Sequence, residues 1–463
     1  MEYEDSFPYH GPLANLTSTI PYDNAKLQYF LTRAHTLDIE IIPLIQTFGH
    51  MEHALKLKEF QHLRESKEHP DSICPSNNES INLIKEMLHQ VIDFHTTITP
   101  LKHIHIGCDE VYQLNKCQKC HDRNLANRNL FLDHMNTVKT LVYNFNPLIS
   151  ILMWDDMFRK INRNQWNEET MANLQEMEPV YWDYSPNLGR VSHMNLFRYH
   201  GTFRNIWIAS AFKGADGKQA FLPELNKRFQ NHYAWLNLIL NYMFAGEKKV
   251  FNFKGVILTG WSRYSHLDPL CELLPSSLSS LVMNLLLIQK YRDGVTISDT
   301  LLEPHVFLER YIVKKLTGEL NCNDNFIMHK NIGTAIATYN NKSNTLVASL
   351  KRYKILVTDI DATFKNDVAI VSLVEYYSHI RNLNVQHSES ALNWCKKILK
   401  EILRWEKETS LILMKYYDKF VIEEYIGYKT YSVKTKIKKT FHNLKQYLKV
   451  NVWKRRSYNF SFR

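Results

Sequence analysis

The chain alternates short apolar runs of strand length with longer stretches whose apolar residues recur every three or four positions. This alternation is typical of βαβ units, in which helices connect parallel strands and cover the sheet. We predict strands at Ile39–Gln46, Lys102–Gly107, Ser150–Trp154, Pro179–Asp183, Ile206–Ala211 and Gly255–Trp261. We predict helices at Asn24–His35, Ser80–His95, Asn124–Tyr143, Leu222–Phe244 and Leu273–Lys290, with Ser80 as an N-cap and Pro223 in a first turn.

These strands imply an α/β fold of the (β/α)8 TIM-barrel type, which needs eight strands and roughly 250 residues. The opening Met1-Glu2-Tyr3 is a candidate for a seventh strand. Exposed edges of a parallel sheet are costly, so a curved barrel is favoured over the alternative of an open sheet. We therefore predict a barrel over residues 1–293 that lacks its first strand and helix.

Beyond about Asp293 only helical patterns remain, and residues 294–463 are predicted to form a helical C-terminal region that packs on the barrel. A coiled-coil partner helix is the less favoured use of this region. Two helical stripes stand out after the Asn-rich loop Asn340–Asn344: Ile370–Ile380, and the set Leu392, Cys395, Ile398, Leu399, Ile402 and Trp405.

The net charge of +10 is concentrated in the C-terminal tail, because Lys396–Arg463 holds 18 Lys and Arg against 6 Asp and Glu. The segments Lys434–Lys439 and Lys454–Arg456 are basic enough to contact nucleic acid or to act as a nuclear address. No nucleic-acid motif accompanies them, so a solvated basic helix face is favoured and a nucleic-acid partner is not expected.

The cysteine count and the N-terminus indicate where the protein resides. Seven cysteines, an odd number scattered over a long chain, favour reduced thiols and a cytoplasmic or nuclear location. The acidic Met1–Asp5 does not resemble a signal peptide, and no apolar run reaches the roughly 18 residues of a membrane span. We expect no membrane partner.

The segment Cys117-Gln118-Lys119-Cys120-His121 fits a haem-attachment pattern and half of a zinc site. Haem attachment needs an exported protein, and zinc needs four ligands, whereas only two thiols and His121 are local. We expect a loop with two incidental thiols, and neither a metal site nor a cofactor.

The adjacent carboxylates Asp109 and Glu110 follow the apolar run that ends at Gly107. Catalytic groups of a parallel barrel lie at the carboxyl ends of its strands, and glycine eases the turn that would bring both side chains to one substrate. An ionised carboxyl beside a protonated one can cleave the acetal bond of a sugar. The alternative is a helix N-cap Asp beside a solvated Glu.

Three tryptophans, Trp154, Trp182 and Trp261, also stand at predicted strand ends. Each alone is more often a core residue than a site residue. Together, beside strand-end polar groups, they predict an aromatic-walled pocket for the apolar faces of a sugar.

The chain resembles glycoside hydrolase family 20, the β-N-acetylhexosaminidases, and within it the hexosaminidase D group. The resemblance spans roughly residues 1–293. It is carried by Tyr3-Glu4-Asp5, Phe7-Pro8-Tyr9, Gln46–Glu52, His103–Tyr112, Trp154–Met157 and Thr259-Gly260-Trp261.

This resemblance implies a retaining, substrate-assisted mechanism in which the 2-acetamido oxygen of the substrate attacks the anomeric carbon. Glu110 would be the acid and then the base, with its pKa raised by burial, and Asp109 would hold the acetamido N–H. The resemblance also implies that His50 orients the acid and that Asp155 contacts a sugar hydroxyl or supports the site. Either Tyr181 or Tyr184 would donate a hydrogen bond to the acetamido oxygen. The walls of the acetamido pocket would be formed by Trp154, Trp182 and Trp261.

The expected partners are glycans that end in β-linked N-acetylgalactosamine or N-acetylglucosamine, with a homodimer as a further possibility. Two departures from the family pattern stand out: the sugar-binding Arg of its first strand is absent, and Arg263 replaces an acidic residue. The alternative function is therefore a non-catalytic barrel that binds glycans or a protein.

Overall fold

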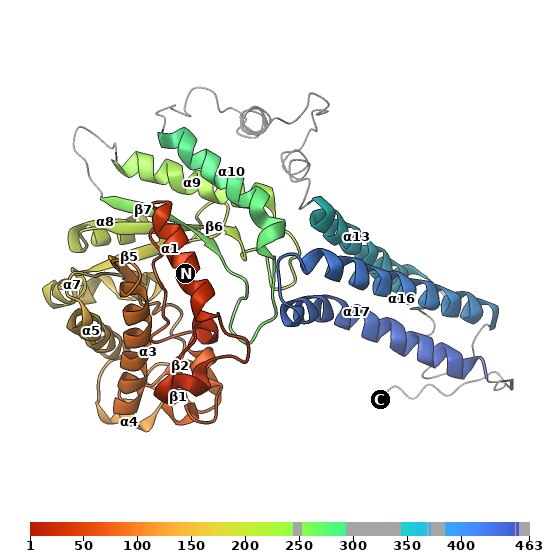
Figure 1. Cartoon of the computed structure of the whole chain (residues 1–463), viewed down its shortest axis with the longest axis horizontal. Helices are drawn as coiled ribbons and strands as arrows, with labels where there is room; N and C mark the ends of the chain where they lie inside the picture. The colour runs from red at the N-terminus through yellow and green to blue at the C-terminus, as the bar shows by residue number, and fades with distance from the viewer. Residues whose placement is uncertain (244–251, 293–343, 368–369, 372–384, 450, 453–463) are drawn as a thin grey trace. The chain divides into compact units, whose positions relative to one another are not determined.

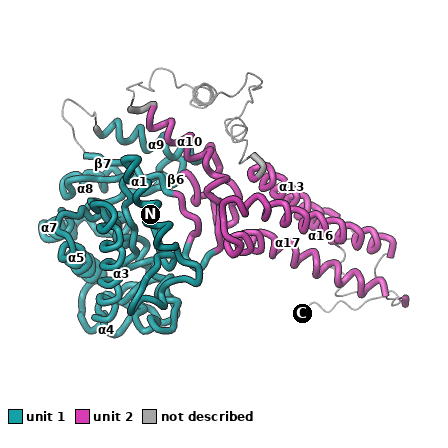
Figure 2. The backbone as a smooth tube through the Cα atoms, viewed as in Figure 1, with its two compact units in different colours: residues 1–211, 227–259, 265–268 teal, residues 212–226, 260–264, 269–463 magenta. Residues whose placement is uncertain are grey.

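The computed structural model describes residues 1–243, 252–292, 344–367, 370–371, 385–449 and 451–452 (Figure 1). The chain divides into two compact units (Figure 2). Unit 1 comprises Met1–Ala211, Lys227–Thr259 and Ser265–Asp268, and unit 2 comprises Phe212–Asn226, Gly260–Tyr264 and Pro269–Arg463. The predicted domain boundary at residue 293 lies outside the described residues.

A five-stranded sheet in the order β3-β4-β5-β6-β7 forms the centre of the fold. The strands are β3 (His103–His105), β4 (Ser150–Trp154), β5 (Met177–Trp182), β6 (Ile206–Lys213) and β7 (Phe253–Gly260). The pairs from β3 to β6 are parallel. Two isolated parallel bridges, Glu2 with Leu44 and Leu44 with His105, extend the series. Among the described residues, seven strand positions thus follow one another in chain order, which confirms the predicted barrel type with one position fewer than eight.

The predicted strand Ile39–Gln46 is wrong in extent, because only Leu44 pairs with its neighbours. Pro43 has no N–H to donate, although its carbonyl accepts from His105 N at 2.9 Å. Ile39 is 54% exposed and lies outside the sheet. The apolar content of residues 39–46 therefore predicted a longer strand than the structure contains.

Helices follow the strands and surround them in unit 1 (Figure 1). The longer ones are α1 (Asn24–Thr36), α3 (Asn78–Thr96), α5 (Asn127–Phe145), α7 (Glu168–Leu174), α8 (His193–Thr202) and α9 (Leu225–Met243). The shorter ones are α2 (Glu52–Leu55), α4 (Gln118–Asp122) and α6 (Asp156–Arg159), with 3-10 turns η1 (Glu4–Ser6), η2 (Gly11–Leu16), η3 (Gln61–Leu63) and η4 (Arg163–Gln165). Successive helices α3, α5, α7 and α8 pack against their neighbours.

Two predicted helix starts need correction. Helix α3 is capped by Asn77, whose side chain accepts from Glu79 N at 3.2 Å, and Ser80 lies inside the helix. Helix α9 begins at Leu225, so Pro223 precedes it. The antiparallel hairpin of β1 (Arg64–Ser66) and β2 (His69–Ile73) was not predicted from the sequence, because its strands are short and polar.

Apolar side chains of the sheet and helices form one core in unit 1. Ile104 of β3 and Ile151 of β4 are fully buried, as are Ile84 of α3 and Val138 of α5. Burial of such a side chain contributes about 1.5–3 kcal/mol, so this core fixes the strands whose carboxyl ends carry the polar groups described below.

Unit 2 contains α10 (Leu274–Arg292), α13 (Asn344–Asn366), α16 (Val385–Leu413) and α17 (Lys419–Tyr447). The predicted stripe of α16 faces a second core, where the ring of Trp405 stacks on that of Tyr353 with centroids 3.9 Å apart.

Three predicted features lie outside the described residues: most of Ile370–Ile380, the loop residues 340–343 and Lys454–Arg456. Lys436, Lys438 and Lys439 are exposed on α17. None of the described helices is both long and apolar enough to cross a membrane.

Gly107 should be essential to the end of β3. Its φ of 71° favours glycine, and an added Cβ would lie 1.9 Å from Gln46 Oε1. We expect Gly107→Ala to cost about 2 kcal/mol or more in the free energy of unfolding. Gly201→Ala in α8 is the matched control, because nothing lies within 4 Å of its added Cβ. Urea unfolding of both variants measures the difference, and equal midpoints would contradict the role of Gly107.

Candidate active site

The segment that follows β3, residues 106–112, is called here the carboxylate loop. Gly107 and Cys108 both have left-handed backbone conformations, with φ of 71° and 68°, and Glu110 has φ of 47°. His105 Nδ1 accepts from Gly107 N at 3.0 Å and supports the turn. Non-glycine residues adopt this conformation at a cost, and such strain concentrates at functional sites. The turn takes Asp109 and Glu110 out of the sheet, as predicted.

A second segment, residues 46–51, contacts the carboxylate loop backbone to backbone and is called the histidine loop. A Cβ on Gly49 would lie 2.2 Å from the carbonyl oxygen of Asp109, so only glycine permits this approach. His50, with φ of 53°, then places Nε2 at 3.4 Å from Asp109 Oδ2 and 3.3 Å from Glu110 Oε2. The structure thus brings together three residues that the sequence singled out.

His50, Asp109 and Glu110, called here the carboxylate triad, influence one another's protonation. Burial opposes a charge on His50, but Asp109 and Glu110 outweigh it and raise the pKa of His50 to about 10. Burial raises the pKa of Asp109, although the His50 cation opposes the shift. The hydrogen bond from His50 lowers the pKa of Glu110, which remains 35% exposed at its side chain. The expected rise in the pKa of Glu110 is therefore not seen in this structure.

Asp156 is a site residue that the sequence analysis missed. Its Oδ2 accepts from Glu110 N at 3.0 Å, and its Oδ1 accepts from Trp182 Nε1 at 3.3 Å. Burial and the nearby Asp109 raise the pKa of Asp156 to about 7. One carboxylate thus links the carboxylate loop to an aromatic side chain at the end of β5. Its position beside Asp155 at the end of β4 was a signal that could have identified it.

Asp155 is fully buried and its oxygens are engaged by protein groups. Arg159 Nε donates to Oδ2 at 2.7 Å, and Tyr199 Oη donates to the same atom at 2.9 Å. Trp182 N donates to Oδ1 at 3.3 Å. Of the two roles considered for Asp155, these contacts favour support of the site over contact with a sugar hydroxyl.

Tyr181 and Tyr184 lie in different surroundings. Tyr181 is fully buried, its hydroxyl accepts from Ser192 N at 3.0 Å, and the guanidinium of Arg159 lies 4.2 Å from its ring centroid. Tyr184 is half-buried, with its ring centroid 5.3 Å from that of Trp182. Of the two tyrosines that the sequence proposed for the acetamido oxygen, the greater exposure favours Tyr184, and the contact itself stays a prediction.

The three tryptophans are not equivalent. Trp154 ends β4 and is 3% exposed, with its ring 4.6 Å from that of His105. Trp182 ends β5 and is half-buried. Trp261 directly follows β7 and belongs to unit 2, where its carbonyl accepts from Lys213 Nζ at 2.7 Å.

Arg263, the residue that departs from the expected acidic type, forms an ion pair within unit 2. Its NH2 group donates to Glu424 Oε2 at 2.8 Å. Glu424 lies in α17, so this arginine is engaged by the helical region.

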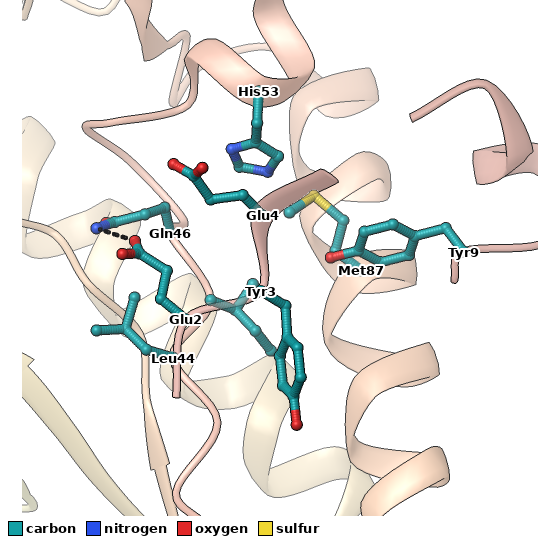
Figure 3. Close-up of a pocket in the computed structure, with 9 residues that line it drawn as sticks. Glu2, Tyr3, Glu4, Tyr9, Leu44, Gln46, His53 and Met87 are labelled. Carbon is teal, nitrogen blue, oxygen red and sulfur yellow. Dashed lines mark hydrogen bonds between the residues drawn. The ribbon is translucent and has the colours of Figure 1, made fainter. Parts of the chain in front are cut away.

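The first residues of the chain add further acidic groups next to the histidine loop (Figure 3). Glu2 Oε1 accepts from Gln46 Nε2 at 3.2 Å, in a small pocket that Tyr3, Glu4 and His53 also line. Burial, followed by repulsion from Glu4 and Asp109, raises the pKa of Glu2 to about 8. The sequence analysis missed Glu2 as a neighbour of the site.

Glu4 and Asp5 are held by two basic residues that the sequence analysis did not connect with them. His266 Nδ1 lies 2.8 Å from Glu4 Oε2, and Lys56 Nζ donates to Asp5 Oδ2 at 2.9 Å. Burial opposes a charge on His266, but Asp5 and Glu4 raise its pKa to about 9. These contacts fasten η1 to residues far along the chain.

The triad makes a spectroscopic prediction. His50 should stay protonated to about pH 10, whereas buried His134, whose pKa burial lowers to about 4, should be neutral and serve as an internal reference. Side-chain NMR of the imidazole carbons as a function of pH measures both. In an Asp109→Asn/Glu110→Gln double variant the pKa of His50 should fall by at least two units, since the groups that raise it are gone. An unchanged titration would contradict the geometry.

Comparisons with known proteins identify the family of the chain. Residues 11–181 match the model of the glycosyl hydrolase family 20 catalytic domain, a span that contains His50, Asp109, Glu110 and Asp156. Hexosaminidase D of Homo sapiens is 38% identical over 296 residues, which cover 62% of this chain and 58% of that protein. Hexosaminidase D of Bos taurus is 37% identical over 290 residues, which cover 61% of this chain and 80% of that protein.

Among solved structures, dispersin B is similar with a TM-score of 0.34 and 17% identity, covering 54% of this chain and 72% of that one. The pneumococcal virulence factor StrH is similar with a TM-score of 0.40 and 15% identity, covering 72% of this chain and 77% of that one. On the family match and the two hexosaminidase D relatives, the chain belongs to glycosyl hydrolase family 20.

Proposed function

We propose that the chain is a retaining exo-β-N-acetylhexosaminidase that uses the 2-acetamido group of its substrate as the nucleophile. The observation that carries the proposal is the placement of adjacent Asp109 and Glu110 around one histidine at the end of β3. Both carboxylates lie on the same loop, so neither needs to attack from the opposite face of the sugar. Family membership and the hexosaminidase D relatives support the same chemistry.

Asp109 is suited to hold the acetamido N–H. Its Oδ1 is buried and makes no hydrogen bond of good geometry with the described residues, although the nearby Gln46 side chain helps to stabilise the carboxylate. The His50 cation favours the ionised form of Asp109, which would accept the N–H and balance positive charge as the oxazolinium ion develops. A fixed acceptor also orients the acetamido oxygen toward the anomeric carbon.

Glu110 is suited to the proton transfers. It donates its proton to the glycosidic oxygen as the acetamido oxygen forms a bond to the anomeric carbon and the leaving group departs. It then removes a proton from water, which attacks the same carbon and opens the oxazolinium ring with net retention. A bound sugar that excludes water from the exposed Glu110 carboxyl would raise its pKa toward that of an acid.

Further side chains would shape the sugar site. Trp182 is held by Asp156, and Tyr184 lies beside it, so this pair is placed to contact the acetamido group. Trp154 is a further proposed wall, whereas the wall expected at Trp261, a residue of unit 2, stays a prediction from the sequence. Terminal N-acetylgalactosamine and N-acetylglucosamine both carry the required acetamido group, so both are proposed substrates. We retain the prediction of a cytoplasmic or nuclear location.

A second candidate is a non-catalytic barrel that binds glycans or a protein. The observation that favours it is the presence of seven strand positions among the described residues rather than eight. Substrate contacts from the remaining position would then be missing, whereas the carboxylates would still bind an acetamido sugar. Hydrolysis distinguishes the two functions.

The test is release of nitrophenol from 4-nitrophenyl N-acetyl-β-galactosaminide and its gluco epimer by the purified chain. We expect Glu110→Gln and Asp109→Asn each to lower kcat/KM by about 10²–10⁴, because each removes a group that acts in the transition state. Glu169→Gln, an exposed carboxylate of α7, is the control and should be unchanged. A folded chain that binds N-acetylhexosamine but releases no nitrophenol would establish the binding function instead.

A further inference from the structure

Three cysteines and one glutamate converge in unit 1 outside the carboxylate triad. Cys74 follows β2, Cys117 and Cys120 flank the start of α4, and Glu65 lies in β1. One ligand atom from each lies within 4.8 Å of all the others. Glu65, Cys74 and Cys120 are buried, and Cys117 is half-buried. The segment Cys117–His121 lacks two of the four ligands of a zinc site. Glu65 and Cys74, more than forty positions earlier in the sequence, supply them.

The distances fit a tetrahedral metal shell. Cys74 Sγ lies 3.2 Å from Cys117 Sγ and 3.8 Å from Cys120 Sγ, and Cys120 Sγ lies 3.2 Å from Glu65 Oε2. Two thiolates bound tetrahedrally to Zn²⁺ at about 2.3 Å are separated by about 3.8 Å. A disulfide would need about 2.05 Å and would leave the third thiol beside a buried carboxylate.

Neighbouring groups hold the ligand atoms in place. Glu65 Oε1 accepts from Lys116 N at 2.6 Å and from Cys117 N at 3.2 Å, which leaves Oε2 directed at the thiols. Cys117 Sγ accepts from Cys120 N at 3.4 Å, and Ser76 Oγ lies 3.1 Å from Cys120 Sγ. Such outer contacts orient metal ligands and offset the negative charge of thiolates.

We propose that Glu65, Cys74, Cys117 and Cys120 bind a structural Zn²⁺ ion. Four protein ligands leave no open position, as in structural rather than catalytic zinc sites, and a sulfur-rich tetrahedral set favours zinc. Zinc binding would displace the thiol protons into solvent. This proposal replaces the expectation of two incidental thiols and no metal. His121 is exposed and is not among the ligands.

The ion would join the two loops of the active site. Cys117 and Cys120 lie just after the carboxylate loop, and Glu65 and Cys74 bracket the hairpin β1–β2. The hairpin in turn holds the histidine loop: Met51 N donates to Asp71 O at 2.9 Å, and Ile73 N donates to Phe48 O at 3.1 Å. By holding the hairpin and the start of α4 together, zinc would help to position His50, Asp109 and Glu110 without contacting them.

The first test is the metal content of the full chain, expressed with zinc under reducing conditions and measured by plasma mass spectrometry. We expect about one Zn per chain. Cys74→Ser and Cys120→Ser should each lose most of it, whereas Cys395→Ser, a buried thiol of α16, should retain it. Zinc content is independent of hydrolysis, so failure of this proposal and failure of the proposed function are distinguishable.

The second test needs no cysteine variant to fold. Cobalt-substituted wild-type chain should show the visible bands of tetrahedral Co²⁺ and a thiolate charge-transfer band. That band should persist in Glu65→Gln, which keeps all three thiolates, while affinity in chelator competition falls at least tenfold. A folded wild-type chain with only trace zinc and no such band would overturn the proposal. So would iron in place of zinc, or a disulfide linking Cys74 to Cys117 in mass spectra of the reduced-state preparation.

Discussion

The arrangement of the site depends on the close approach of two backbones. A side chain at Gly49 would collide with the carbonyl of Asp109, and one at Gly107 would collide with Gln46. Only because these two positions lack a Cβ can the histidine loop and the carboxylate loop meet, and only then does His50 contact both carboxylates. The core beneath β3 and β4 fixes the positions from which both loops start.

The second constraint is electrostatic. Asp109 interacts electrostatically with Glu2, Glu110 and Asp156, and the His50 cation lies beside Asp109 and Glu110. Burial raises the pKa values of Asp156 and Glu2, whereas the hydrogen bond from His50 lowers the pKa of Glu110. The carboxyl groups therefore differ in their tendency to ionise, and the proposed acid role of Glu110 depends on the rise in its pKa when a bound sugar excludes water.

Local sequence patterns predicted those parts of the fold that local physics determines. Strand β4 has the predicted bounds, and helix α1 starts at the predicted residue, because apolar periodicity is a property of one segment. Asp109 and Glu110 were found by their place after a strand. The burial of Tyr181 and Asp155 and the link from Asp156 to Glu110 depend on packing between strands. The short polar hairpin β1–β2 has no periodic apolar pattern that would predict it. This hairpin brings Glu65 and Cys74 close to Cys117 and Cys120.

The most direct test of the central claim is calorimetric binding of a thiazoline analogue of the oxazolinium ion, because it probes the proposed intermediate without requiring turnover. We expect the analogue to bind much more tightly than N-acetylhexosamine itself, and its affinity to fall at least tenfold in Asp109→Asn. Failure of the folded chain to bind the analogue, or equal affinity in Asp109→Asn, would contradict a substrate-assisted mechanism at this site.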